Sequence, residues 1–240
     1  MAAAGRTTAD PPSHQGCAIS SVRPGLPAQR GELRDRREDG HHLHHLVWRL
    51  GPGVRVCSSA VLGGGIGPRA WILNAQVPGG YPRLDPDRHL AGIAAAEGLS
   101  GPGAGLMTAA DVAAYTTARD GGVTATVTAG LGVRGWAAAP DGDRAPAFRP
   151  GTVNIVVTLP AALSDAALVN AVATATEAKV QALLDAGLDC SGTPTDAVCV
   201  AAPDPGPDGG EPFAGPRSTW GARIARAVHG AVLAGARPAA

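Results

Sequence analysis

Aromatic side chains and lysine are scarce in this chain of 240 residues. Aromatics make up 3% of the sequence, and Lys179 is the single lysine beside nineteen arginines. The 34 glycines and 21 prolines leave Ala, Val, Leu and Ile to build a core in which backbones approach closely. The formal net charge is zero, so the sequence offers no basic surface for nucleic acid or for an anionic membrane.

The cysteines and the apolar segments indicate the cellular compartment in which we expect the protein to function. Cys17, Cys57, Cys190 and Cys199 have neither metal-ligand spacing nor the density of a disulfide scaffold, so we expect reduced thiols. Residues 1–16 lack the charged-then-apolar order of a secretory signal, and no apolar run approaches the roughly 18 residues of a membrane span. We therefore expect a soluble cytoplasmic protein with no membrane partner.

Two segments with different patterning predict the domain organisation. Residues 1–40 are polar, carry mixed charges and show no apolar periodicity, which is typical of a disordered N-terminal tail. Residues 41–240 then form a single domain, because a chain of this length can bury a proper core. The domain opens on HHLHHL, in which His41, His42, His44 and His45 invite comparison with a metal site. No fixed outside partner accompanies them, so we interpret them as surface or strand-entry histidines.

The order of apolar runs and turns predicts an α+β fold. We expect helices over 85–97, 164–186 and 218–234, the first with Asp85 as N-cap and Pro86 in its first turn. Strands are expected over 46–50, 54–63, 70–77, 104–109, 124–131, 153–159 and 196–202. Glycine-rich connections between the early strands favour antiparallel pairing, hence a mixed, largely antiparallel sheet covered by helices in one compact domain. In the last helix, Trp220, Ile224, Val228 and Val232 share a face that serves either the core or a subunit contact of a homo-oligomer.

The helix predicted over 164–186 carries the unusual charges. At 100° per residue, Glu177 falls on a polar arc, whereas Lys179 falls on the opposite apolar side. That polar arc comprises Asn170, Thr174, Glu177, Gln181 and Asp185, and the apolar side comprises Leu168, Val169, Val172, Thr176, Val180, Leu183 and Leu184. Lys179 either extends its ammonium to water or is desolvated on the apolar face, where burial lowers the pKa of a lysine unless a carboxylate holds it charged. Glu177 is either a solvated surface residue or a functional one.

Polar turns stand at the entry of two predicted strands. Residues 151–154 read GTVN and residues 192–196 read GTPTD, which supply Asn154, Thr193, Thr195 and Asp196. Glycine permits close backbone approach and threonine supplies hydroxyls, so each turn either cradles a reacting carbonyl oxygen or is simply a well-made turn. Ser58 and Ser59 on an earlier strand are further possible polar contacts.

Two short motifs carry no function in this interpretation. The GGGIG run at 63–67 has no following Lys-Ser/Thr and lacks G-x-G-x-x-G spacing, so it is not a phosphate loop. Residues 87–92, with His89 at their centre, match D-x-H-x-x-G, a cobalt-ligating pattern of some corrinoid-binding domains. Here the pattern falls inside the helix predicted over 85–97 rather than on a loop, so we take the match as chance.

Seven words of sequence, in this order, resemble the adenosylcobinamide amidohydrolase family: CSSAVLGGGIGPRAWILNAQV, GLMTAADV, GVTATVTAGLG, GTVNIVVTLP, EAKVQALLDAG, SGTPTDAVCVAAP and FAGPRSTWGARIARAVH. The resemblance runs from about Leu46 to Ala236. It implies hydrolysis of the amide that joins the aminopropanol arm to the corrin ring of adenosylcobinamide, which releases aminopropanol and adenosylcobyric acid for cobalamin biosynthesis by cobinamide salvage.

Hydrolysis of an unactivated amide needs a nucleophile, donors for the oxyanion and a proton for the leaving amine. We expect Glu177 to act as general base and proton donor, with Lys179 as its electrostatic partner or as an acid. Asn154, Thr193, Thr195 and Asp196 would orient the amide and the oxyanion, and Thr193 or Thr195 as a covalent nucleophile is the alternative. Further polar residues expected to contact the corrinoid are Ser58, Ser59, Asn74, Gln76 and Thr108, together with Trp71 unless it belongs to the core.

Two other functions remain open at this point. One is a non-catalytic corrinoid-binding protein, and the other is an amidohydrolase or acyltransferase with a different substrate. Cobalt belongs to the corrinoid substrate, so we expect no metal site and no required cofactor in the protein, and activity that survives a chelator.

Overall fold

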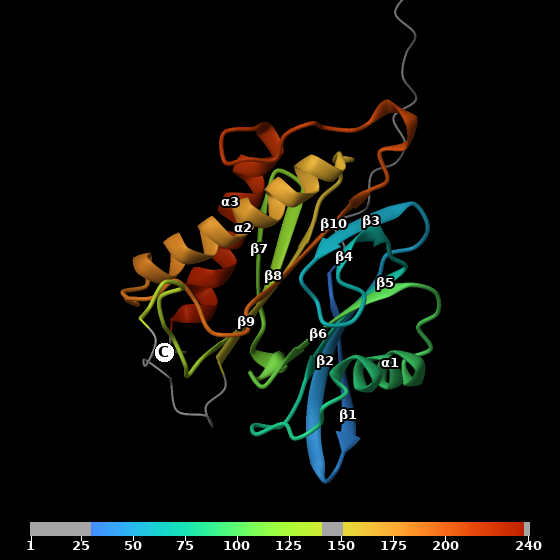
Figure 1. The fold of residues 1–240 in the computed structure, drawn as a ribbon, viewed down its shortest axis with the longest axis vertical. Coiled ribbons are helices and arrows are strands. Elements are labelled where there is room, and N and C mark those ends of the chain that lie inside the picture. Colours follow the sequence, from blue (N-terminus) through green and yellow to red (C-terminus); the bar gives the residue numbers. More distant parts are fainter. Residues whose placement is uncertain (1–29, 141–150, 238–240) are drawn as a thin grey trace, which may run out of the picture.

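The computed structural model describes residues 30–140 and 151–237, and these form four layers (Figure 1). The first sheet has the strand order β1-β2-β5-β6, and the second has the order β4-β3-β10-β9-β8-β7. Helix α1 (Pro86–Ala96) covers the outer face of the first sheet, and α2 (Asp165–Asp185) and α3 (Thr219–Ala236) cover the outer face of the second. The two sheets pack face to face between these helices.

The strand bounds follow the turns of the sequence. The first sheet contains β1 (Glu32–Glu38), β2 (His41–Arg49), β5 (Trp71–Gln76) and β6 (Gly103–Thr108). The second contains β3 (Val54–Ser58), β4 (Gly65–Pro68), β7 (Thr116–Asp120), β8 (Val123–Leu131), β9 (Gly151–Thr158) and β10 (Ala197–Pro203). Two short 3-10 helices, η1 (Val112–Ala114) and η2 (Gly206–Asp208), lie in connections. All neighbouring strands are antiparallel except β5 with β6 and β9 with β10.

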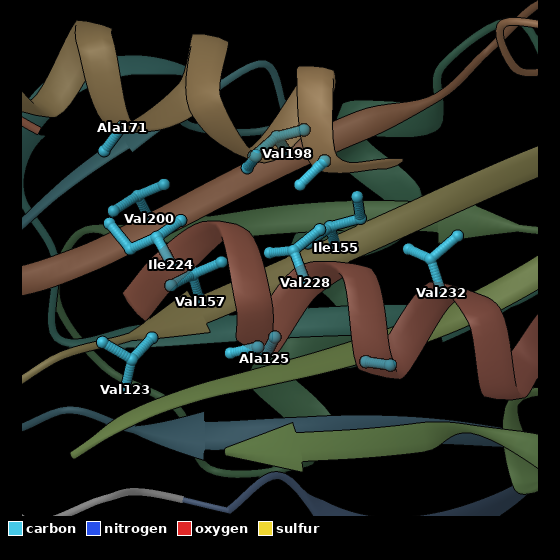
Figure 2. Packing of buried hydrophobic residues seen from close by; sticks show 14 of the residues in the cluster. Val123, Ala125, Ile155, Val157, Ala171, Val198, Val200, Ile224, Val228 and Val232 are labelled. Atoms are coloured by element: carbon cyan, nitrogen blue, oxygen red, sulfur yellow. The ribbon is translucent and has the colours of Figure 1, made fainter. Parts of the chain in front are cut away.

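Three apolar clusters fill the spaces between the layers. The largest lies between the second sheet and helices α2 and α3, where Figure 2 shows valines and Ile155 of the strands meeting Ile224, Val228 and Val232 of α3. A second cluster joins the two sheets, and a third lies under α1. The aliphatic face predicted for the last helix therefore belongs to the core of its own chain.

Local sequence sets the helix starts. Ser164 and Ser218 cap α2 and α3, since each side-chain oxygen accepts a hydrogen bond from the backbone N–H three residues later. Asp85 occupies the cap position of α1, but its carboxylate binds the Arg83 guanidinium at 2.9 and 3.0 Å and makes no cap bond. Pro86 in the first turn supports the start of α1 instead.

The α+β fold class is confirmed, while three details of the prediction are wrong. Residues Glu32–Glu38, placed in the expected tail, form β1, a charged strand at an open sheet edge where charge discourages further pairing. Residues 1–29 of that expected tail lie outside the described residues. The strands form two sheets rather than one, and β2 and β3 do not pair, because the Gly51–Gly53 turn carries the chain from one sheet to the other.

Several general features can be checked within the described ranges. No helix there is long and apolar enough to cross a membrane. Cys57, Cys190 and Cys199 are free thiols, and Cys17 lies outside the described residues. Across residues 30–140 and 151–237, no group of three or more His, Cys, Asp or Glu side chains is placed to hold a metal ion.

Candidate active site

A buried ion pair joins α2 to the turn that precedes β10. The Lys179 side chain is 8% exposed, and its Nζ binds Oδ2 of Asp196, whose side chain is 12% exposed. The lysine therefore does not extend to water, and it is desolvated with a carboxylate as its hydrogen-bond partner. Burial of both partners means that neither charge can be removed without leaving the other poorly solvated.

Asp196 is the centre of this hydrogen-bond network. Its Oδ1 accepts bonds from the Thr193 hydroxyl and from the backbone N–H of Val153, the latter at 2.8 Å. The backbone N–H of Thr193 donates to Oδ2 at 3.2 Å, beside the Lys179 ammonium. Thr193 Oγ1, the Asp196 carboxylate and Lys179 Nζ thus form one continuous chain of hydrogen bonds.

The backbone at Gly192 leaves space for these hydrogen bonds. A Cβ atom at Gly192 would collide with Asp196 Oδ2 and Lys179 Nζ, so the turn accepts only glycine without a shift of the ion pair. Thr195 Oγ1 donates to the Gly151 carbonyl oxygen at 3.0 Å and lies 2.6 Å from Thr152 Oγ1. The GTVN and GTPTD turns, distant in the sequence, are therefore bonded to one another at the starts of two parallel strands.

Glu177 does not belong to this network. It lies on the exposed face of α2, and it makes no side-chain hydrogen bond or ion pair among the described residues. The face predicted for α2 also needs correction: Thr174 is buried, whereas Val169, Thr176 and Leu184 are exposed. The buried face consists chiefly of alanines, because α3 packs closely against α2 and leaves little room for branched side chains.

A loop with an exposed tryptophan lies beside the network. Gly135 exchanges backbone hydrogen bonds with residues of the next turn: its N–H donates to the Gly192 carbonyl at 3.1 Å, and its carbonyl accepts from Ser191 N at 3.0 Å. Trp136 follows, 46% exposed, whereas Trp48 and Trp71 are 1% and 6% exposed. Trp136 has no signal in the sequence that marks it as functional, since one aromatic residue in a glycine-rich loop shows no periodicity.

Three predicted corrinoid contacts are instead buried between or within the sheets. Asn154 Nδ2 donates to Asn74 Oδ1 at 2.8 Å and to the Met107 carbonyl at 3.1 Å, and Asn74 Nδ2 donates to Thr128 Oγ1 at 3.0 Å. Asn74, Asn154 and Thr108 are at most 2% exposed. Thr108 Oγ1 accepts from the Ala110 N–H at 3.0 Å in a local turn. These amides therefore fix one sheet on the other.

The remaining predicted contacts also serve the framework. Ser58 Oγ donates to the Val198 carbonyl at 3.1 Å, and Ser59 Oγ accepts from Val198 N at the same distance, which ties β3 to β10. Trp71 packs in the cluster under α1. Gln76 accepts a bond from His44 N at 3.2 Å. None of the four makes a hydrogen bond to Lys179, Thr193 or Asp196.

A second polar centre was missed altogether. His45 and His89 are both buried, and both line one cavity between the first sheet and α1. The surface interpretation holds for His41 and His42 but is wrong for His45. The signals were present in HHLHHL and in the 87–92 motif, but only the fold brings β2 and α1 together.

An α+β domain that holds a hydroxyl, a carboxylate and a buried ammonium in one hydrogen-bonded chain has the groups used in nucleophilic hydrolysis. Comparison with known proteins identifies the family. The family model described as adenosylcobinamide amidohydrolase matches residues 29–239. The chain therefore belongs to the adenosylcobinamide amidohydrolase family, as the resemblance of its sequence words predicted.

Two relatives carry the same description. The adenosylcobinamide amidohydrolase of Methanosarcina mazei is 34% identical over 186 residues, which cover 74% of this chain and 88% of that protein. The adenosylcobinamide amidohydrolase of Halobacterium salinarum is 47% identical over 95 residues, which cover 40% of this chain and 38% of that protein.

Proposed function

We propose that the chain hydrolyses the amide between the aminopropanol arm and the corrin ring of adenosylcobinamide, giving adenosylcobyric acid and aminopropanol. Family membership supports the reaction. The observation that carries the assignment to a site is the hydrogen-bonded chain Thr193–Asp196–Lys179, since it supplies a nucleophile, a base and a cation together.

In this proposal Thr193 Oγ attacks the amide carbon. Its proton already lies in a hydrogen bond to Asp196 Oδ1, so transfer to the carboxylate needs no rearrangement. The Lys179 ammonium stabilises the negative charge that develops on the carbonyl oxygen. As the C–N bond breaks, the proton passes from Asp196 to the aminopropanol nitrogen, and an ester to Thr193 remains.

Water then completes the reaction. It adds to the ester carbon and loses a proton to Asp196, and the C–O bond to Thr193 breaks as that proton returns to the hydroxyl. Adenosylcobyric acid leaves as a carboxylic acid. The four hydrogen bonds that Asp196 accepts hold its carboxylate in place beside the Thr193 hydroxyl, where it can take up and return each proton.

The exposed face of Trp136 gives the corrin ring a place to bind. A flat, largely apolar macrocycle buries much of its area against an indole, and this indole is held to Gly192 by the backbone bonds of Gly135. In this proposal the amide arm extends to the Thr193 hydroxyl while the macrocycle stays outside. Thr195, exposed beside the same turn, would contact the arm.

The proposal is tested by the release of aminopropanol and adenosylcobyric acid from purified variants, followed by chromatography. Thr193→Ala and Lys179→Met should lower turnover at least about 100-fold, since they remove the nucleophile and the oxyanion charge. Glu177→Gln is the matched control, because it removes a charge from the same helix at an exposed position. Near-normal turnover in Thr193→Ala, or loss of turnover in Glu177→Gln, would refute the assignment.

The same incubation separates the other functions. A non-catalytic corrinoid-binding protein would retain cobinamide without releasing aminopropanol. An amidohydrolase or acyltransferase for another substrate would leave adenosylcobinamide unbound.

A further inference from the structure

A cavity of about 340 Å³ lies between α1 and the outer face of the first sheet. Strands β1 and β2 contribute Arg36, Glu38 and His45 to its wall, and α1 contributes Arg88 and Gly92. Its volume falls within the range of about 300–1,000 Å³ that is typical of small-molecule sites. Lys179, Thr193 and Asp196 are not among its lining residues, so it is separate from the candidate active site.

His45 presents an unused hydrogen-bond acceptor in this wall. Its Nε2 lies 2.9 Å from Glu97 Oε1, and because a carboxylate only accepts, this nitrogen carries the hydrogen. Burial lowers the pKa of His45 in spite of the neighbouring Glu97, so the ring is neutral near pH 7. Nδ1 is then a lone-pair acceptor, and it is buried with no hydrogen-bond partner among the described residues.

The two ring nitrogens of His89 lie next to side chains of the protein. Tyr81 Oη lies 2.8 Å from its Nδ1, with the two rings stacked, and Glu38 Oε1 lies 2.5 Å from Nε2 without hydrogen-bond alignment. Both ring nitrogens face protein groups, and the residue sits inside α1 as expected. His89 therefore shapes the cavity and holds Glu38, rather than presenting a free nitrogen to a ligand.

The cavity also has unsatisfied cationic groups. Arg36 Nε binds Glu38 Oε2 at 2.9 Å and its Nη2 binds the Gln76 carbonyl at 2.6 Å, but its buried Nη1 has no partner in the described chain. Arg88 makes no ion pair with another described residue. The lining residues include four arginines against two glutamates. Arg83 is paired with Asp85 and Arg36 with Glu38, so Arg37 and Arg88 are the lining cations that have no ion pair among the described residues.

We propose that this cavity binds a small hydroxylated oxyanion, either a phosphate monoester or a hydroxycarboxylate. The oxyanion would accept hydrogen bonds from Arg36 Nη1 and Arg88, and the ligand's hydroxyl would donate to His45 Nδ1. One molecule with both groups satisfies the buried donor and the buried acceptor that the fold leaves open. A bare inorganic anion meets the arginines alone and should bind less tightly.

Isothermal titration of the full chain with glycerol phosphate, glycerate and inorganic phosphate tests this site. At least one of the two hydroxylated anions should bind at least about tenfold more tightly than inorganic phosphate. The tighter binder of the two shows whether the ligand is a phosphate monoester or a hydroxycarboxylate. Arg88→Ala, at an exposed helix position, should weaken that binding about tenfold, which corresponds to one charge-assisted hydrogen bond.

Gly92 allows the cavity to be filled without disturbing the fold. No heavy atom lies within 4 Å of a Cβ placed there, and the residue is in the middle of α1. Gly92→Leu should therefore fold, abolish anion binding and retain adenosylcobinamide hydrolysis. Gly92→Ala is the matched control, because it also raises the helix propensity at this position but adds only a small side chain, and it should retain binding.

Three results would overturn the inference: no binding of either hydroxylated anion, unchanged binding in Gly92→Leu, or loss of amide hydrolysis in a folded Gly92→Leu protein. The last would place the cavity in the reaction site instead. Because binding is measured without a corrinoid, the result does not depend on whether the proposed hydrolase function is correct.

Discussion

Replacing the two members of the buried ion pair should have unequal effects on stability. Asp196→Asn removes the negative charge and leaves the Lys179 ammonium 8% exposed with no carboxylate. Breaking a buried pair in this way costs about 3–5 kcal/mol. For a domain of this size the melting temperature should fall by about 6–20 °C.

Lys179→Met should cost less. Asp196 keeps three donors after the lysine is removed, namely Val153 N, Thr193 N and Thr193 Oγ1, and methionine fills much of the space of the lysine stem. The loss of one charged hydrogen bond is worth about 1.5–3 kcal/mol. The double variant should be more stable than Asp196→Asn alone, because it no longer buries an unpaired ammonium.

Urea denaturation of the wild type, the two single variants and the double variant measures this coupling as a double-mutant cycle. We expect a coupling energy of about 2 kcal/mol or more. Additive single effects, or a double variant less stable than Asp196→Asn, would refute the account of the pair as a buried, mutually dependent unit. Glu177→Gln on the same helix should change stability by less than about 0.5 kcal/mol and serves as the control.

Three further predictions follow from single positions. Gly192→Ala should cost at least about 2 kcal/mol in urea denaturation and most of the turnover, because the new Cβ collides with the ion pair; normal stability would contradict the close approach. Trp136→Phe should abolish the quenching of tryptophan fluorescence by bound corrinoid with little change in the other tryptophans, and persistent quenching would place the macrocycle elsewhere. Burial lowers the pKa of His45 below its unfolded value of about 6.5, so the unfolded chain takes up a proton before the folded one does, and the free energy of unfolding should fall as the pH drops below about 6.5. A His45→Gln variant should lose that part of the pH dependence in denaturation measured from pH 8 to pH 5. A pH profile of stability that is unchanged in this variant would refute the prediction.

Local signals predicted the helices well. The starts of α1, α2 and α3 lie within one residue of the predicted ones, and the serine caps of α2 and α3 and the proline in the first turn of α1 are all short-range features. The orientation of α2 was predicted less well. Because valine is more hydrophobic than alanine, the sequence favours Val169 over Ala175 for the buried face of α2. The close packing of α3 favours the alanine face instead, and packing against a distant helix is not a local property.

The candidate site was half predictable. Lys179, Thr193 and Asp196 stood out because each is an unusual residue in a helix or turn. Their partnership was not visible, because it forms only when the connection through α2 returns the chain beside β9. The same limit applies to Glu177, because residues two apart on a helix point in different directions, and only the buried Lys179 contacts Asp196.

The parallel pair β9 and β10 has a consequence for the order of folding. The ion pair spans 17 residues and the bond from Val153 to Asp196 spans 43, whereas the bonds that join β3 to β10 span 139 and 140. Loop closure costs more entropy as the loop grows, so the strand–helix–strand unit with its network has the lower contact order. We therefore expect the residues proposed for catalysis to assemble within one contiguous segment, before the N-terminal half of the chain packs against it.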